Sequence, residues 1–233
     1  FDFLWKDGAE IATGIRFGRM ESGIGVYHSL GLEDHVYGLG EKTGGLDKRG
    51  RRYLMRNTDV WLEHESGIGD FTDPLYASFP VYLVHDAGRS FGVFLDNPEF
   101  VRFDLSDRLS CSVHVPAEVL NCYFLPGPAL PDVVRRYTDL TGRMELPALW
   151  TLGYHQCRWS YPDEAAVRNT AKQLRRRSIP ADGIWFDIDY MDGYRVFTWN
   201  RKAFPQPQRL VEDLSNDGFR AVSIIDPGIK VEK

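Results

Sequence analysis

The sequence predicts a mixed fold, an all-β antiparallel sandwich followed by the beginning of a parallel α/β sheet. Two observations lead to this prediction. Short β-like runs fill the chain up to about Leu125, and strand-like and helix-like patterns alternate after Trp150. The length of 233 residues and the 43% hydrophobic content suit a globular protein of one large or two small domains.

The first half has the pattern of an antiparallel sandwich. Its runs are rich in Val, Tyr, Phe and Leu and are separated by Gly, Asp, Asn and Pro, which favour turns. The clearest are Pro80–Val84, Phe91–Leu95, Phe100–Leu105 and Val119–Phe124. The segment from Gly38 to Asp73 is polar and rich in glycine, and we expect a long loop there with a functional role.

A helix and a hinge separate the two patterns. We expect the helix over Pro131–Thr141, because proline suits the first turn and Gly142 follows the last. The hinge is expected over Gly142–Pro147. The predicted domains are therefore a sandwich over residues 1–130, a helix and linker over 131–147, and a parallel domain over 148–233.

The second half reads as strand, helix, strand, helix and strand. The expected elements, in that order, are Trp150–Cys157, Asp163–Arg177, Ile184–Tyr190, Pro207–Asn216 and Arg220–Ile225. Apolar strands linked by helices indicate parallel pairing, and we expect the sheet to be covered on both faces. Three strands are too few for a (β/α)₈ barrel of about 250 residues or for a usual doubly wound sheet. We therefore interpret the chain as the front of a larger protein.

Charge and cysteine content exclude several classes of function. The net charge of −5, without a clustered basic face, argues against nucleic-acid binding. No stretch approaches the roughly 18 consecutive apolar residues of a membrane helix. The three cysteines are widely separated, which excludes a disulfide framework and favours a reducing compartment such as the cytoplasm.

The densest cluster of candidate chemistry is the segment from Asp187 to Asp192. If the strand continues to Tyr190, a period of two places Asp187 and Asp189 on one face. Ligands bind at the carboxyl ends of parallel strands, where two acids can accept from sugar hydroxyls, hold a metal or divide acid and base roles. The alternative is that one acid caps the following turn and the other is solvated.

The other two strand ends add aromatic and polar residues. Trp159 follows the first strand and Asp226 the third, and such a mixture suits a carbohydrate pocket. Trp159 could equally be packing in the interior. We expect His155 to be a core histidine with satisfied ring nitrogens and Cys157 to be a buried small residue rather than a nucleophile.

The glycine-rich run Gly38–Gly45 does not fit a phosphate-binding loop. In that motif the Lys-Ser/Thr pair follows the last glycines at a helix start, whereas here Lys42 and Thr43 precede them. The dinucleotide-binding pattern also fails, so we expect no phosphate site.

Six motifs, in order along the chain, resemble glycoside hydrolase family 31, and most closely its α-glucosidases. They span nearly the whole chain from Tyr37 onward. The motifs are Gly38-Leu-Gly-Glu-Lys-Thr-Gly44, Asn57-Thr-Asp59, Asp73-Pro-Leu-Tyr-Ala-Ser-Phe-Pro80, Gly153-Tyr-His-Gln-Cys-Arg-Trp-Ser160, Asp187-Ile-Asp-Tyr-Met-Asp-Gly193 with Phe197-Thr-Trp199, and Ile224-Ile-Asp-Pro-Gly228.

The resemblance implies an architecture and an activity. The architecture is an N-terminal, galactose-mutarotase-like β-sandwich followed by a TIM (β/α)₈ barrel, of which this chain would hold about three βα units. The activity is hydrolysis of α-glycosidic bonds with retention, releasing glucose from the non-reducing end of an α-glucoside oligosaccharide. Two carboxylates about 5–5.5 Å apart perform such a reaction, as nucleophile and as acid/base.

The resemblance also assigns residues of this sequence to sugar binding. Asp187 is similar to the acid that binds the far hydroxyls of the non-reducing glucose, and Ile188 and Ile224 are similar to walls of that subsite. Trp159 resembles the aromatic residue beside it. Asp59 resembles an acid on a loop of the N-terminal domain that reaches the sugar of the leaving group.

The sequence departs from the family in lacking its catalytic residues. The Trp-x-Asp-Met-Asn-Glu motif that carries the nucleophile is not present, and neither Asp187 nor Asp189 should take its place. We therefore expect the chain alone to be inactive, with no catalytic residue, metal or cofactor of its own. The alternatives are a non-catalytic carbohydrate-binding protein and an α-xylosidase, α-galactosidase or lyase of the same family. Self-association is left open.

Overall fold

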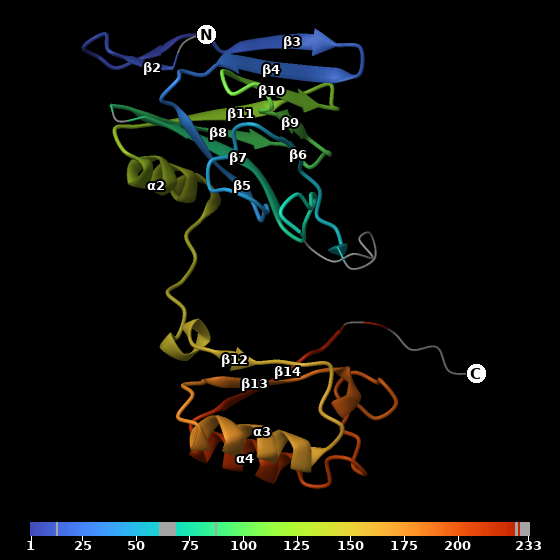
Figure 1. Cartoon of the computed structure of the whole chain (residues 1–233). Helices are drawn as coiled ribbons and strands as arrows, with labels where there is room; N and C mark the ends of the chain where they lie inside the picture. The colour runs from blue at the N-terminus through green and yellow to red at the C-terminus, as the bar shows by residue number, and fades with distance from the viewer. Residues whose placement is uncertain (13, 61–68, 87, 227, 229–233) are drawn as a thin grey trace. The chain divides into compact units, whose positions relative to one another are not determined.

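The computed structural model describes residues 1–12, 14–60, 69–86, 88–226 and 228. The chain forms two compact units, Phe1–Arg143 and Met144–Lys233, and each is described by itself. Figure 1 shows the strands of the first unit in layers and the helices of the second packed on its sheet.

The first unit is an antiparallel sandwich, as the sequence predicts (Figure 1). A five-stranded sheet has the order β3-β4-β10-β9-β6, and a four-stranded sheet has the order β11-β8-β7-β5. A short hairpin of β1 (Phe3–Leu4) and β2 (Glu10–Ala12) precedes them. The strands of the five-stranded sheet are β3 (Arg16–Met20), β4 (Gly23–Ser29), β10 (Ser110–Val115), β9 (Arg102–Asp104) and β6 (Arg52–Leu54). Those of the four-stranded sheet are β11 (Asn121–Gly127), β8 (Ser90–Asp96), β7 (Ser78–His85) and β5 (His35–Gly40).

Alternation along the strands builds one core between the two sheets. In β10, Cys111, Val113 and Val115 are buried while the residues between them are partly exposed. The buried side chains of both sheets form a single apolar cluster, which includes Tyr82 and Phe91 of the four-stranded sheet. Strand β6 was not expected. It lies inside the predicted Gly38–Asp73 loop, so the prediction of one long irregular loop is wrong.

The helix α2 (Leu130–Thr141) packs on the outer face of the four-stranded sheet (Figure 1) and belongs to the first unit. Two glycines allow its close approach. A Cβ atom at Gly92 would lie 2.7 Å from Val133 Cγ1, and one at Gly127 would lie 2.8 Å from Val133 Cγ2. Larger residues at either position would push the helix away from the sheet.

The second unit is a parallel three-stranded sheet of β12 (His155–Gln156), β13 (Gly183–Phe186) and β14 (Arg220–Ser223), in that order. The helices α3 (Glu164–Arg176) and α4 (Pro207–Asn216) begin and end close to the predicted residues. The Asp163 side chain caps α3 by accepting from the Ala166 amide at 2.8 Å, and Pro207 begins α4.

Both helices lie on the same face of this sheet (Figure 1), where Ile184 and Phe186 share an apolar cluster with Val167 and Leu210. The expectation that helices cover both faces is therefore wrong for the described residues. Sequential strand order with crossovers of one hand carries each helix to the same side, as in a (β/α)₈ barrel and not in a doubly wound sheet.

All three predicted parallel strands end earlier than expected, and β14 stops at Ser223 instead of Ile225. The segment Leu149–Leu152 is a 3₁₀-helix, η1, and only His155–Gln156 pairs in the sheet. Strand β13 ends at Phe186, and Ile188–Tyr190 forms a second 3₁₀-helix, η2. Period-two alternation therefore does not apply beyond Phe186, and the prediction that it places Asp187 and Asp189 on one face is wrong.

Candidate functional site

The candidate site is the edge of the sheet at which the three parallel strands end. Trp159 follows β12, Asp187 and Ile188 follow β13, and Ile224 follows β14. Because parallel strands end on the same side of a sheet, four of the five predicted sugar-binding residues belong to one edge. This is the edge at which barrel proteins bind their ligands.

Asp187 has one carboxylate oxygen engaged and one open. Its Oδ1 accepts a hydrogen bond of 2.7 Å from the Ile188 amide and caps η2. Its carbonyl oxygen accepts from the Tyr190 amide at 3.2 Å, so the turn holds the residue in place. Among the described residues, none donates a hydrogen bond to Oδ2. A half-buried carboxylate with an open oxygen can accept from a ligand hydroxyl, and one predicted alternative, a capping acid, is also correct for Oδ1.

Ile188 and Ile224 add an apolar surface to the candidate site, and hydrogen bonds fix the backbone around them. The Ile224 amide donates to Phe186 O at 3.0 Å, and the Tyr190 hydroxyl donates to Ile224 O at 2.9 Å. Both isoleucines are partly exposed while packed against the apolar cluster of the second unit. They can therefore contact the apolar face of a ligand without losing their packing.

A group of aromatic rings packs against the turn formed by Asp187 and η2. Phe186 packs edge-to-face on Trp199 and Phe204, with centroids 5.5 and 6.1 Å away, and Tyr190 lies 4.8 Å from Trp199. Such packing restricts the side chains that hold the turn, and so helps to pre-organise Asp187.

Trp159 is 77% exposed, so it does not pack in the interior of the described unit. Of the two expectations for Trp159, packing is therefore wrong for this chain, and an indole available for stacking is what the structure provides. Its neighbour Tyr161 is buried beneath the Arg158 guanidinium, which lies 5.8 Å from the ring centre.

Cys157 is exposed, and the expectation that it is buried is wrong. Partial desolvation and then the nearby Asp187 carboxylate raise the pKa of the Cys157 thiol. A raised pKa keeps the thiol protonated and makes it a poor nucleophile, which agrees with the prediction that it has no catalytic role. This electrostatic effect is consistent with the pairing of β12 with β13, which places the ends of the two strands near each other.

His155 is a satisfied histidine, as predicted. The Trp185 indole donates to its Nδ1 at 3.0 Å, and its Nε2 lies 2.9 Å from Trp150 O. Because a carbonyl oxygen only accepts, Nε2 carries the proton and the ring is the neutral tautomer. Both ring nitrogens are used, so His155 is not free to bind a ligand.

Two exposed aromatic residues were not among the predicted site residues. Tyr194 and Phe197 lie in the turn after η2 with φ of 62° and 61°, a conformation that bulky residues seldom adopt. A hydrogen bond to Asp189 raises the pKa of Tyr194. Phe197 stands in one of the six motifs but is given no role there. Periodicity gives no sign of positive φ at an aromatic residue, so the exposed placement of these two rings could not be predicted from the sequence.

Asp59 lies in the first unit and is exposed, next to the buried Val60. The Thr58 amide donates to Leu75 O at 3.1 Å and ties this segment to the chain before β7. Its role toward the sugar of the leaving group stays a prediction.

Lys42, in the glycine-rich run, is a structural residue. Its side chain is fully buried, and Nζ donates to Leu54 O at 2.8 Å, Asp73 Oδ1 at 2.7 Å and Ser78 Oγ at 3.1 Å. All three of its protons are used, which leaves none for a phosphate. Burial lowers the pKa of Lys42, and the Asp73 carboxylate acts against that change.

The part of the chain that the structure describes has neither a metal-binding cluster nor a membrane-spanning helix. No group of three or more His, Cys, Asp or Glu side chains there has an arrangement that could hold a metal ion. None of the described helices is both long and apolar enough to cross a membrane.

Family profiles match both units. Residues 6–104 match the glycosyl hydrolase 31 N-terminal galactose mutarotase-like domain, and residues 144–233 match the glycosyl hydrolases family 31 TIM-barrel domain. These matches agree with the sandwich and with the singly wound parallel sheet.

Curated relatives and solved structures give the same result. The chain is 46% identical over 200 residues to alpha-glucosidase 2 of Bacillus thermoamyloliquefaciens, covering 84% of this chain and 25% of the relative. It is 35% identical to human neutral alpha-glucosidase AB over 237 residues, covering 90% and 24%. A Flavobacterium johnsoniae GH31 dextranase complexed with glucose superposes with a TM-score of 0.80 at 30% identity, covering 95% and 27%. The chain thus spans about a quarter of the length of these relatives.

Proposed function

The chain belongs to glycosyl hydrolase family 31, and from this membership we propose that it supplies the glucose-binding part of a retaining α-glucosidase. The complete enzyme would release glucose from the non-reducing end of α-glucosides. The nucleophile and the acid/base would lie outside these 233 residues, because the chain spans only a quarter of its relatives and lacks the family's nucleophile motif.

The observation that carries this proposal is the open Oδ2 of Asp187 at the ligand-binding edge of the sheet. A carboxylate fixed through one oxygen can accept from two neighbouring sugar hydroxyls with the other, in a geometry that a free side chain would not keep. Ile188 and Ile224 would contact the apolar face of the ring, and Trp159 would stack at its side.

The fixed carboxylate also favours glucose over related sugars. Hydrogen bonds to Asp187 need hydroxyls at the far side of the ring, which a pentose lacks in part and an epimer presents in another direction. A half-buried acceptor that the bound sugar covers without donating to it costs binding energy, so α-xylosides and α-galactosides should be poorer substrates.

The test is the activity of the complete protein on an aryl α-glucoside, with the product anomer followed by NMR. We expect α-glucose as the first product and a loss in kcat/KM for Asp187→Ala of about tenfold to hundredfold for each hydrogen bond lost. Asp187→Asn keeps the cap of η2, since asparagine also caps well, and separates the loss of charge from a loss of fold.

Asp192→Ala is the matched control, because this acid lies in the same turn with its side chain largely exposed. Its kcat/KM should stay near that of the wild type. Equal kcat/KM for wild type and Asp187→Ala would remove Asp187 from the sugar site, and β-glucose as the first product would refute retention. The 233-residue chain alone should show no turnover.

A further inference from the structure

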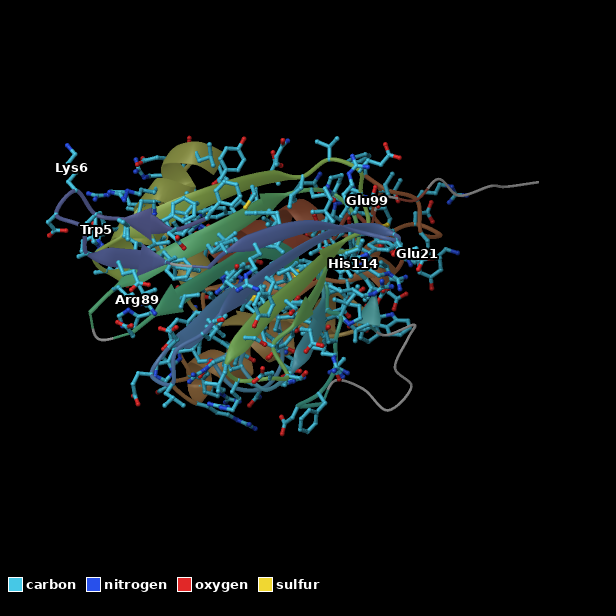
Figure 2. All side chains as sticks on the ribbon, turned by 90° about the horizontal axis from the view of Figure 1, so that it is seen from above. Trp5, Lys6, Glu21, Arg89, Glu99 and His114 are labelled. Atoms are coloured by element: carbon cyan, nitrogen blue, oxygen red, sulfur yellow. The ribbon has the colours of Figure 1, made fainter. Side chains whose placement is uncertain are left out.

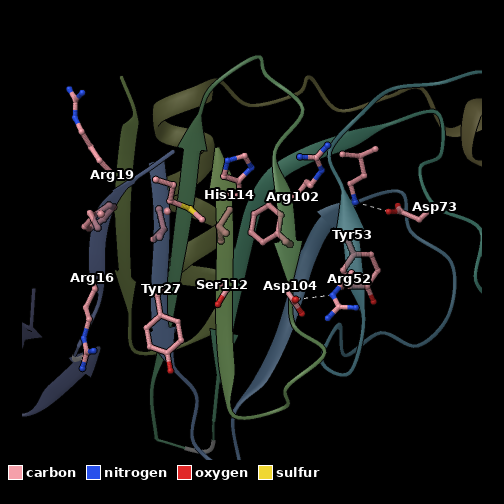
Figure 3. Close-up of a pocket in the computed structure, with 18 residues that line it drawn as sticks. Arg16, Arg19, Tyr27, Arg52, Tyr53, Asp73, Arg102, Asp104, Ser112 and His114 are labelled. Carbon is pink, nitrogen blue, oxygen red and sulfur yellow. Dashed lines mark hydrogen bonds and ion pairs between the residues drawn. The ribbon is translucent and has the colours of Figure 1, made fainter. Parts of the chain in front are cut away.

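A second cavity lies far along the chain from the sugar-binding edge, on the outer face of the five-stranded sheet. Its volume is about 780 Å³, within the roughly 300–1,000 Å³ range of small-molecule sites. We call it the outer-sheet trough. It is lined from all five strands, by residues that include Arg16, Tyr27, Arg52, Arg102, Ser112 and His114 (Figure 3).

The strand register aligns its polar side chains in two rows across the sheet. The first row runs from Arg16 through Tyr27, Ser112 and Asp104 to Arg52, each residue opposite the next on a neighbouring strand. Four strand spacings separate its ends, about 19 Å at the usual spacing. The trough therefore suits an extended ligand.

The second row leaves part of the backbone of the trough accessible, because two of its residues are glycines. It runs from Gly18 through Gly25, His114 and Arg102 to Leu54. The two glycines lie opposite each other and leave the backbone bare at Gly18, where a Cβ atom would meet nothing within 4 Å. The Met20 sulfur lies over Gly25, 2.9 Å from where a Cβ would be. Methionine is flexible enough to move aside for a ligand.

The trough is positively charged although the whole chain carries a net charge of −5. Arg52 Nε donates to Asp104 Oδ2 at 2.8 Å, and Asp73 is bound to Lys42, so both lining acids are already paired. No carboxylate among the described residues pairs with the remaining three arginines, Arg16, Arg19 and Arg102. Charge complementarity therefore calls for an anionic ligand.

The other side chains add the features of a saccharide site. Tyr27 is 37% exposed, and the Arg16 guanidinium lies 5.9 Å from its ring centre, so ring and cation form one wall. His114 lies beside Glu21 at one end of the first unit, whereas Arg89 lies at the other end (Figure 2). The Nε2 atom of His114 lies 2.9 Å from the carbonyl oxygen of Ser22, so in the neutral imidazole ring Nδ1 can accept a hydrogen bond.

We propose that the outer-sheet trough binds an oligosaccharide that carries carboxylates, of the uronic acid class. Arg102 and Arg16 would pair with the carboxylates, Tyr27 would stack on a pyranose ring, and Ser112 and His114 would bind hydroxyls. Binding here would hold an acidic saccharide on the first unit independently of the hydrolytic site.

The test is isothermal titration of the 233-residue chain with three probes of similar length, a trigalacturonate, maltotriose and a triglutamate peptide. We expect the trigalacturonate to bind at least about tenfold more tightly than either, a difference equivalent to one charge-assisted hydrogen bond. Its affinity should fall between 50 and 200 mM salt, because salt screens the arginines. Maltotriose can also bind at the proposed Asp187 site, so it refutes charge recognition only if it binds as tightly and Tyr27→Ala weakens its binding. The peptide binding as tightly would refute saccharide recognition.

Two variants place the binding in the trough. Arg102→Gln and Tyr27→Ala should each weaken the trigalacturonate about tenfold or more. Arg209→Gln, at an exposed arginine of α4, is the matched control and should bind as the wild type does. Arg102 is exposed, so its variant should keep the thermal midpoint. Unchanged affinity in Arg102→Gln would overturn the proposal, as would no binding by the wild-type chain.

Discussion

The segment between β5 and β6 and the turn after β13 both concentrate charged residues, and they use them in opposite ways. In the first, the strong hydrogen-bonding positions of Lys42 and Asp47 are occupied, those of Lys42 by groups in and after β6 and those of Asp47 by Arg49 and by β5. In the second, Asp187 uses one oxygen to cap its own turn and keeps the other open. Both segments are expected to be functional from the sequence, and the partners of each charge in the structure separate their roles.

This difference gives a physical criterion for assigning a role to a charged motif. A buried charge is stable only when its partners repay the desolvation, so full pairing indicates a structural role. An oriented charge with an unfilled position is held for a partner from outside the described residues. By this criterion the buried pair of Lys42 and Asp73, which we call the clamp, has a structural role, and the Asp187 turn is the proposed binding site. Three measurements can test it.

The largest effect is expected for the clamp. Lys42→Met leaves the Asp73 carboxylate, 12% exposed, without its cation, and breaking a buried pair in this way typically costs about 3–5 kcal/mol of unfolding free energy. Urea denaturation of the 233-residue chain, followed by alkylation of the thiol of Cys111, which is buried in the sandwich, measures it. Lys172→Met is the control at an exposed lysine of α3 and should stay within about 0.5 kcal/mol of the wild type. A cost as small for Lys42→Met would show that the clamp is not structural.

A smaller effect with a characteristic pH dependence is expected at Asp47. Burial alone would raise the pKa of Asp47, but hydrogen bonds from Arg49, the Val36 amide and His35 outweigh it and hold that pKa well below its ordinary value of 3.8. A carboxyl whose pKa is lower in the folded state stabilises the fold above the unfolded-state pKa. That stability is lost as the pH falls from about 4 through the lowered folded-state pKa.

Asp47→Asn should therefore cost about 2 kcal/mol at pH 7, as expected for charge-assisted hydrogen bonds. The difference from the wild type should shrink steadily below pH 4. Asp70→Asn, at an exposed acid, serves as the control and should follow the wild-type curve. A difference between Asp47→Asn and the wild type that stays constant from pH 7 to pH 2 would contradict the assignment.

The sequence predicts the elements whose ends carry their own signals. The helices α3 and α4 were predicted within one residue because Asp163 caps one and Pro207 begins the other. The end of β13 was missed because the Asp187 side chain caps the 3₁₀-helix that follows it. In the sequence, an acid after an apolar strand looks the same whether it extends the strand or caps the next turn. Strand β6 was missed because its three residues pair with β9, about fifty residues away.

The position of the candidate site could be predicted from the sequence, but the hydrogen bonding of its residues could not. Residues at the ends of parallel strands meet at one edge, so Asp187, Ile188, Ile224 and Trp159 could be grouped from their places in the sequence. The open oxygen of Asp187 could not, because it depends on which groups the folded turn brings near it. The outer-sheet trough could not be predicted either, since strand register alone aligns Arg16 with Arg52.

The smallest expected effect tests the turn itself, through the thiol of Cys157. The Asp187 carboxylate is one of two causes that raise the pKa of this thiol, after partial desolvation. Asp187→Asn removes the negative charge and keeps the cap, so the pKa should fall and the thiolate fraction at pH 8 should rise. We expect the alkylation of Cys157 by iodoacetamide to become about twofold to fivefold faster, because one partly screened negative charge is lost.

Peptide mass spectrometry separates Cys157 from Cys111 and Cys122, which are less exposed. Asp192→Asn, with the same change in net charge, should leave the rate unchanged. If both variants accelerate the reaction equally, the effect belongs to net charge, and Asp187 is not oriented toward the end of β12.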